Sequence, residues 1–180
     1  MRVEAPIKVD RKTKRLAKRL TGREIAVINH MDIDEVAANS LVEGKVKLVI
    51  NAAQSISGKY PNKGPGILTD KNILIIDNVG QELFDELKEG QIIEVNNGQI
   101  YRDGQLLGEG SVLDKDKVAI KIKEAYDNMS VELDRFIDNT IEYAKKEKGF
   151  ILGEVEIPKV KTKYKDRHVL VVVRGQDYKE

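Results

Sequence analysis

Short apolar runs alternate with amphipathic segments along the first half of the chain. The apolar runs lie at residues 25–28, 48–50 and 73–76 and are rich in Val and Ile, which is typical of buried strands. The segments around them have a helical pattern, at residues 11–23, 32–43, from 65 onward and at 81–88. Strands that alternate with helices predict a mainly parallel sheet with right-handed crossovers.

Two of these expected helices have recognisable starts. Asp10 is placed to cap the basic helix over residues 11–23. Asp32 and Glu35 have the spacing of a capping box, with Asp in place of the usual Ser or Thr. The helix that begins there should turn four positions inward: Val36, Ala37, Ser40 and Leu41.

The pattern changes after residue 90. Residues 91–95 alternate between apolar and polar positions, and Asn97-Gly98 is a strong hairpin signal. Asp103-Gly104 supplies a second turn before another apolar stretch. The sequence therefore predicts a small antiparallel meander that closes the α/β unit.

Residues 114–148 contain one glycine-free and proline-free stretch that predicts a long helix. Its apolar or semi-polar positions recur at steps of four and three, which is a heptad seam. The members of the seam are Ile122, Tyr126, Met129, Leu133, Phe136, Thr140 and Tyr143. The seam could pack on the parent domain or on a second copy of the chain, so a homodimer through this helix is one expectation.

The last segment has the pattern of another domain's beginning. After a connection that contains Pro158, residues 169–173 are continuously apolar, as in a strand that opens a parallel α/β domain. The sequence thus predicts an α/β domain with a basic N-terminal helix over residues 1–112 and a long amphipathic helix over 113–150. Residues 151–180 would be a linker and the first strand of a truncated second domain.

Composition excludes several classes of protein. The 180 residues include 31 basic and 30 acidic ones, for a formal charge of +1, which argues against a general attraction to nucleic acid or membranes. No apolar run is long enough to insert in a bilayer, and the N-terminus lacks the apolar core of a signal peptide, so a cytoplasmic protein is expected. With no cysteine, two histidines and no phosphate-binding or nucleophile motif, no catalytic residue, metal site or cofactor is assigned.

The candidate site is the loop that follows the apolar run at residues 48–50. Open α/β folds bind ligands where strands end, and hydroxyl, amide, ammonium and glycine N–H groups gather here. The candidate residues of the loop are Asn51, Ser55, Ser57, Gly58, Lys59, Tyr60, Asn62 and Gly64. Arg11 and Lys12 could add charge if the basic helix folds over the loop, and His30 ends a neighbouring strand. An anionic small molecule or a partner loop would fit these groups.

Each of these features also has a structural interpretation. Gly and Pro in the loop can serve only to turn the chain, and the basic helix face can simply be solvated. His30 can be a structural hydrogen-bonding residue rather than a catalyst. Asp32 and Asp34 could bind a cation, although acids at a helix N-terminus are already explained by the helix dipole.

The order of elements over roughly residues 25–101 resembles the swivelling phosphohistidine domain of phosphoenolpyruvate-utilising enzymes. That fold has a strand, a small-residue loop, a helix, a strand and a helix, followed by a glycine-turned hairpin; the matching pieces here lie at 48–50, 55–64, 73–76, 83–87 and 90–101. Its carrier histidine should lie near residues 60–64, but no histidine occurs between His30 and His168. The resemblance implies a swivelling β/β/α core without a phosphoryl-carrier role.

A second resemblance, to the SteA-like bacterial family named for a cytokinetic-ring protein, runs through nearly the whole chain. The matching strings include D-R-K-T-K at residues 10–14, I-A-V-I-N-H at 25–30, D-I-D at 32–34, N-A-A at 51–53, S-I-S-G-K-Y-P-N at 55–62, N-T-I-E-Y at 139–143 and R-H-V-L-V-V-V-R-G at 167–175. Members of this family carry a C-terminal domain similar to thiamine pyrophosphokinase, and its acidic motif would lie beyond residue 180.

The resemblance implies a non-catalytic regulatory or interaction module of a cell-division protein, with a protein partner and recruitment to the division site. Nucleotide or diphosphate-transfer chemistry would belong to the C-terminal domain and not to these residues. The alternative is the substrate-side domain of a thiamine-pyrophosphokinase-like, nucleotide-binding transferase.

Overall fold

The computed structural model describes residues 2–154, 163, 165–166 and 168. The chain divides into two compact units, Met1–Ile137 and Asp138–Glu180. The strand expected over residues 169–173, and the domain that it would open, lie outside the described residues.

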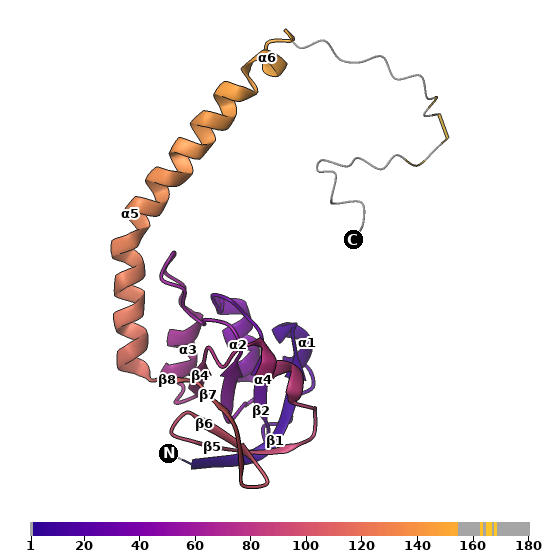
Figure 1. Ribbon diagram of the computed structural model, residues 1–180, viewed down its shortest axis with the longest axis vertical. Helices are drawn as coiled ribbons and strands as arrows, with labels where there is room; N and C mark the ends of the chain where they lie inside the picture. Colours follow the sequence, from indigo (N-terminus) through magenta and orange to yellow (C-terminus); the bar gives the residue numbers. More distant parts are fainter. Residues whose placement is uncertain (1, 155–162, 164, 167, 169–180) are drawn as a thin grey trace. The chain divides into compact units, whose positions relative to one another are not determined.

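Strands of the first unit form one mixed sheet. They are β1 (Arg2–Asp10), β2 (Ile25–Ile28), β3 (Leu48–Asn51), β4 (Leu74–Asp77), β5 (Ile92–Asn96), β6 (Gln99–Arg102), β7 (Gln105–Glu109) and β8 (Ser111–Leu113). Their order is β7-β6-β5-β1-β2-β3-β4-β8 (Figure 1). The four central strands β1 to β4 run parallel, whereas β5 and β8 join the central strands antiparallel.

Helices cover both faces of this sheet. These are α1 (Thr13–Ala17), α2 (Glu35–Glu43), α3 (Gly64–Asp70), α4 (Gln81–Glu86) and the first turns of α5 (Lys115–Lys146), whereas the end of α5 and the short helix α6 (Lys148–Ile151) belong to the second unit. Successive strand residues point to opposite faces, so the sheet supports two cores. One core contains Leu16 of α1, Leu41 of α2, Leu68 of α3 and Val118 of α5. The other contains Leu83 and Phe84 of α4.

The local signals for strands, helices and turns are largely confirmed. The expected alternation of strands and helices over the first half is present, and the meander follows it as β5, β6 and β7. Asn97 and Gly98 have φ values of 49° and 92°, and Asp103 and Gly104 have 51° and 79°. Positive φ at both central residues is what a tight two-residue hairpin turn requires.

Two strands were missing from the sequence prediction. The strand β1 alternates apolar residues at 3, 5, 7 and 9 with polar positions, but Pro6 interrupts this pattern and argues against a strand; β1 nevertheless lies between β2 and β5 in the middle of the sheet. Asp10 therefore ends a strand, and the N-cap position of α1 is occupied by Lys12. The strand β8, at three residues, is too short to give a pattern.

The start of α2 also differs from the prediction. Its N-cap is Asp34, whose carboxylate accepts a hydrogen bond from the Ala37 backbone N–H at 2.6 Å. Asp32 has a positive φ of 53° and accepts a hydrogen bond from the Ser57 N–H instead. The expected inward position of Val36 is wrong as well, because 66% of its surface is exposed.

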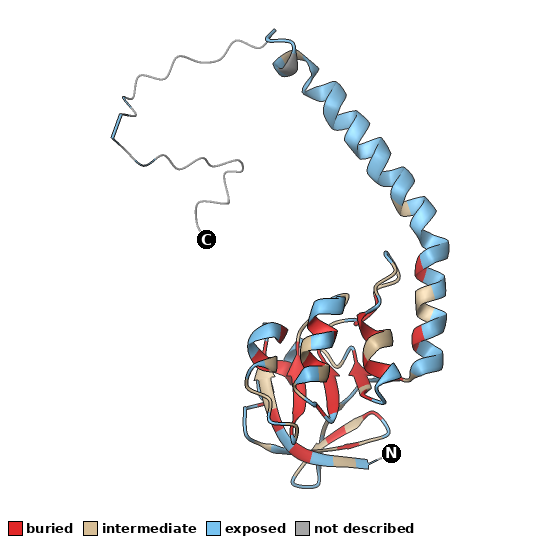
Figure 2. Ribbon diagram, turned by 180° about the vertical axis from the view of Figure 1, so that it is seen from behind, coloured by how far each residue is buried: buried red, intermediate tan, exposed pale blue. Residues whose placement is uncertain are grey.

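The long helix is confirmed as α5. Its first turns pack on the sheet domain, where Val118 and Ala125 are buried and Ile122 lies 3.8 Å from the position that a side chain on Gly66 of α3 would occupy. The later seam positions of the first unit are exposed, as Figure 2 shows. No helix in the described part of the chain is long and apolar enough to cross a membrane.

Candidate functional site

The carboxyl ends of the four parallel strands carry most of the polar side chains that the fold brings together. Asp10 ends β1, Asn51 ends β3 and Asp77 ends β4, while His30 follows β2 by two residues. Carboxyl ends of neighbouring parallel strands meet at one edge of the sheet, which is where open α/β folds hold ligands. This edge is therefore the candidate site.

Asn51 is completely buried, and its amide group holds the backbone of His30 from both sides. The His30 N–H donates to Asn51 Oδ1 at 3.0 Å, and Asn51 Nδ2 donates to the His30 carbonyl at 2.8 Å. The same Nδ2 donates to Ser55 Oγ at 2.8 Å. Asn51 thus fixes the segment after β2 and has no amide hydrogen left for a ligand.

A second buried contact continues this network to β4. The Ser55 N–H donates to Asp77 Oδ1 at 2.7 Å, and both residues are buried. Burial raises the pKa of the Asp77 carboxyl above its ordinary value, although hydrogen bonds from Ser55 and the positive charge of Lys121 oppose the rise. Ser55 and Asp77 therefore stabilise the carboxyl edge from inside.

Asn62 and Gly64 also serve the interior of the loop. Asn62 Nδ2 donates to the carbonyl oxygens of Ile33 and Ser55, at 3.0 and 2.8 Å. A Cβ on Gly64 would lie 2.1 Å from the Ile33 carbonyl oxygen, so only glycine fits. The expectation that all of residues 51–64 form one exposed binding surface is thus corrected, because four of the eight candidates are used inside the domain: Asn51, Ser55, Asn62 and Gly64.

The tip of the loop is the part that remains accessible. Lys59 and Tyr60 are exposed, and Ser57 and Gly58 are half-buried. Gly58 has a φ of 82° with open space around its Cα, and its carbonyl accepts a hydrogen bond from Asn128 of α5 at 3.2 Å. The tip of the loop therefore contacts the long helix α5 and not the basic segment around α1.

In the basic segment around α1, Arg11, Arg15 and Arg19 form ion pairs, whereas the lysines form none with another residue that the structure describes. Arg15 and Arg19 both bind the carboxylate of Asp10, and Arg19 also binds Glu89. The hydrogen bond from Arg15 is the main reason why the pKa of Asp10 lies below its ordinary value. Arg11 binds Asp85 of α4 at 2.8 Å, and its guanidinium lies 5.3 Å from the ring centre of Phe84.

A pocket of about 430 Å³ lies between this basic segment and the segment that follows β2. We call it the carboxyl-edge pocket; its lining includes Lys12, Thr13, Lys14, His30, Met31 and Val36. Arg11 and Lys12 thus come together with His30 as candidates, but none of the lining residues belongs to the loop over residues 51–64.

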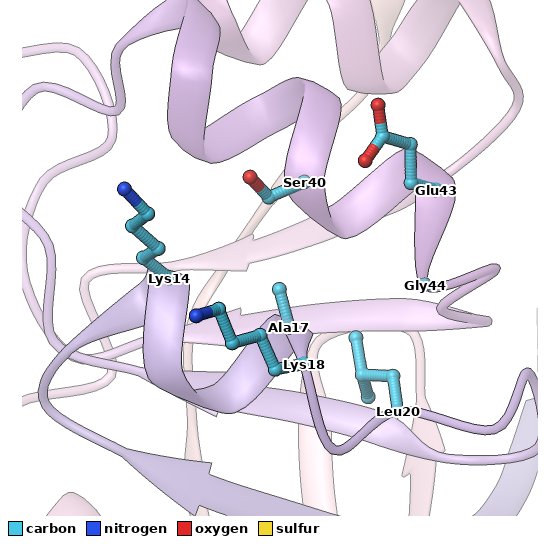
Figure 3. Close-up of a pocket in the computed structure, with 7 residues that line it drawn as sticks. All are labelled: Lys14, Ala17, Lys18, Leu20, Ser40, Glu43 and Gly44. Atoms are coloured by element: carbon cyan, nitrogen blue, oxygen red, sulfur yellow. The ribbon is translucent and has the colours of Figure 1, made fainter.

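A second hollow of about 320 Å³ continues along the two helices (Figure 3). Lys14 and Lys18 line it from the α1 side, and Ser40 and Glu43 line it from α2. Because Lys14 lines both hollows, lysine side chains follow the α1 side of this surface.

Several residues of the site were missed by sequence reasoning, notably Asp77, Asn29 and Lys14. A usable signal existed for Asp77 and Asn29, since each follows or ends an apolar run that becomes a parallel strand. Asn29 Nδ2 donates to Gln81 Oε1 at 2.6 Å, which links this edge to α4.

The chemistry available at this edge is hydrogen bonding and positive charge. Among the described residues, no group of three or more His, Asp or Glu side chains could hold a metal ion. The lining of the carboxyl-edge pocket offers lysines and one imidazole, which suits the binding of an anion. Comparison with family models, with curated proteins and with solved structures gave no match for this chain.

Proposed function

We propose that this chain is a non-catalytic regulatory and interaction module of a SteA-like cell-division protein, and that α5 joins it to a second copy of itself. The sequence resemblance supports the family. The succession of β3, a small-residue loop, α3, β4, α4 and the β5–β6 hairpin supports a swivelling-type core. The single observation that carries the interaction role is the exposed seam of α5.

The seam exposes more apolar surface than a solvated helix needs. Tyr126, Met129 and Leu133 are 51%, 40% and 52% exposed, and they recur with heptad spacing. Large apolar side chains that share one helix face in water favour association. A partner helix that follows the same heptad would cover them.

The occupant we propose is the same helix of a second copy. In a heptad, the positions that flank the seam meet the partner, and like charges there repel two identical helices. Ser130 and Ile137 at these positions are uncharged, and Ala125 is buried against its own sheet domain. Glu132, the acid among the flanking positions from 125 to 137, already binds Arg135 at 2.8 Å. Two copies can therefore approach without repulsion along this flank.

Leu133→Asp tests the association, with Val131→Asp as its matched control. Leu133 and Val131 are 52% and 53% exposed on the same helix, but residues two apart point in nearly opposite directions. We expect light scattering to give twice the 20.3 kDa chain mass for the wild type and for Val131→Asp. Leu133→Asp should be a monomer, because burying an unpaired carboxylate in the seam costs several kcal/mol.

The outcomes separate the parts of the proposal. A monomeric wild type contradicts self-association, and a dimer that both substitutions dissociate equally contradicts association through the seam. A loss of the sheet domain's thermal transition in Leu133→Asp would mean that the seam packs internally. The cell-division role has its own measurement: a fluorescent fusion should gather at the division site, and an even distribution through the cell would contradict that role while leaving the dimer intact.

A further inference from the structure

The carboxyl-edge pocket has the size and the position of a small-molecule site. Its volume of about 430 Å³ is within the range of ligand pockets, and it opens where β1 and β2 end. The segment after β1 supplies Lys12 and α1 supplies Lys14, while the segment after β2 supplies His30. None of its lining residues is in α5, so this inference does not depend on the proposed dimer.

Three polar groups of the pocket are available to a ligand. Lys12 and Lys14 are exposed and form no ion pair with another described residue. His30 Nδ1 lies 2.9 Å from the hydroxyl of Thr13, which is buried. In the tautomer that carries its proton on Nε2, the Thr13 hydroxyl donates to Nδ1 and Nε2 is a donor. Two ammonium groups and, in this tautomer, one imidazole N–H thus line the same pocket.

The other charges of the pocket are engaged elsewhere. Arg11 binds Asp85 of α4 at 2.8 Å. The carboxylate of Asp34 accepts the Ala37 N–H as the cap of α2, at 2.6 Å. The lining carries three cationic residues, Arg11, Lys12 and Lys14, against the carboxylate of Asp34, so its net charge is positive.

The pocket also has an apolar wall. Val36 and Met31 are 66% and 56% exposed, although they are large apolar side chains. Both line the pocket beside the lysines. An inorganic anion would leave this wall in water, whereas an anion that carries an apolar group would cover it.

We propose that the carboxyl-edge pocket binds a small organic phosphate monoester. The phosphate group is a dianion with three terminal oxygens, which matches the donors of Lys12, Lys14 and His30. The organic group lies against Met31 and Val36. A carboxylate has fewer oxygens and one charge, so it satisfies this set less well.

The experiment is a titration of the full chain with phenyl phosphate, inorganic phosphate and phenylacetate, followed by ¹H–¹⁵N NMR at fixed ionic strength. We expect saturable shifts in the amides of residues 11–14 and 29–36, with phenyl phosphate the tightest of the three probes. Lys12→Ala combined with Lys14→Ala should weaken binding of phenyl phosphate about tenfold or more, since two charge-assisted contacts are lost.

Lys47→Ala combined with Lys71→Ala is the matched control. Both lysines are exposed, but they precede β3 and β4 and so lie at the amino edge of the parallel strands. This variant should bind phenyl phosphate within about twofold of the wild type, because distant exposed charges are screened by salt. Both double variants should unfold at the wild-type midpoint.

Three results would overturn the proposal. One is the absence of saturable shifts with phenyl phosphate. Another is an equal loss of affinity in the two double variants, which would indicate a general charge effect. The third is a set of shifts confined to the loop tip around Ser57, Lys59 and Tyr60, which would place the anion on the loop.

Discussion

Asn51→Ala should strongly destabilise the α/β domain, because Asn51 is a buried polar residue whose hydrogen bonds water cannot fully replace. The side chain is completely buried and makes hydrogen bonds to the N–H and the carbonyl of His30 and to the hydroxyl of Ser55. Alanine removes all three partners at once. The segment after β2 and the loop after β3 then lose the contact that ties them together.

The magnitude follows from the groups left without a partner. A buried polar group that loses its hydrogen bond costs about 1–3 kcal/mol. Ser55 keeps its contact with Asp77, and His30 is half-buried, so water can reach part of the gap. We therefore expect a loss of about 2–4 kcal/mol, which is a large share of the roughly 5–15 kcal/mol that stabilises a typical domain.

Urea unfolding measures this loss of stability, and two further variants test its size and its cause. Asn29→Ala removes one hydrogen bond, to Gln81 at the surface, and should cost about 0.5 kcal/mol or less. Asn51→Asp keeps the side-chain volume and the acceptor oxygen, but it removes both N–H donors and places a second buried carboxylate near Asp77. It should be no more stable than Asn51→Ala. A loss under about 1 kcal/mol in Asn51→Ala, or near-complete recovery in Asn51→Asp, would refute the reasoning.

Two other predictions concern single positions of the same edge. Gly64→Ala should lower the unfolding free energy by roughly 3 kcal/mol or more, since its Cβ would lie 2.1 Å from the Ile33 carbonyl oxygen. Gly58→Ala has open space around its Cβ and should cost about 1–2 kcal/mol, because an alanine is strained at the positive φ of this position. Equal losses of stability in thermal melts of the two variants would contradict this. For Asp77, burial raises the pKa, so the native state holds its proton more tightly and stability falls as pH rises from the ordinary value through the raised one. Asp77→Asn should remove that decline in urea titrations across this pH window, and an unchanged slope would count against it.

The parts of the fold that sequence could predict are those that local physics determines. Asn97-Gly98 selects its turn through residues that tolerate positive φ, and the β-branched run over residues 25–28 is apolar enough to be buried in any packing. The long helix follows from a stretch free of helix breakers. None of these requires knowledge of a distant partner.

The missed features depend on contacts that are remote in the sequence. Strand β1 is held by β2 on one side and by β5 on the other, and Pro6 lies opposite Ile92 in that ladder. The choice between Asp32 and Asp34 as the cap of α2 is similar. Either carboxylate could cap a helix, but the carboxylate of Asp32 accepts a hydrogen bond from the N–H of Ser57, which is 25 residues away in the sequence.

The candidate site was predicted in part for the same reason. The small and polar composition of residues 51–64 directed attention to the carboxyl edge of the parallel strands, because the strand before it was recognised. Composition could not separate side chains that bind the protein's own backbone from those that face solvent. Asn51 and Asn62 are polar, as some of the exposed candidates are. Only the structure shows that their side chains already form hydrogen bonds with the backbone of His30 and Ile33.

Asn51 links the two halves of the carboxyl edge, and this affects how its variants are interpreted. It is absent from the lining of the carboxyl-edge pocket, yet it holds both backbone groups of His30, which lines that pocket. Loss of its amide therefore loosens one wall of the pocket without removing any group that could touch a ligand. Weaker binding in an Asn51 variant would accompany lower stability, and it could not identify a contact. Lys12 and Lys14, which are exposed and support no other element, are the positions where affinity can change alone.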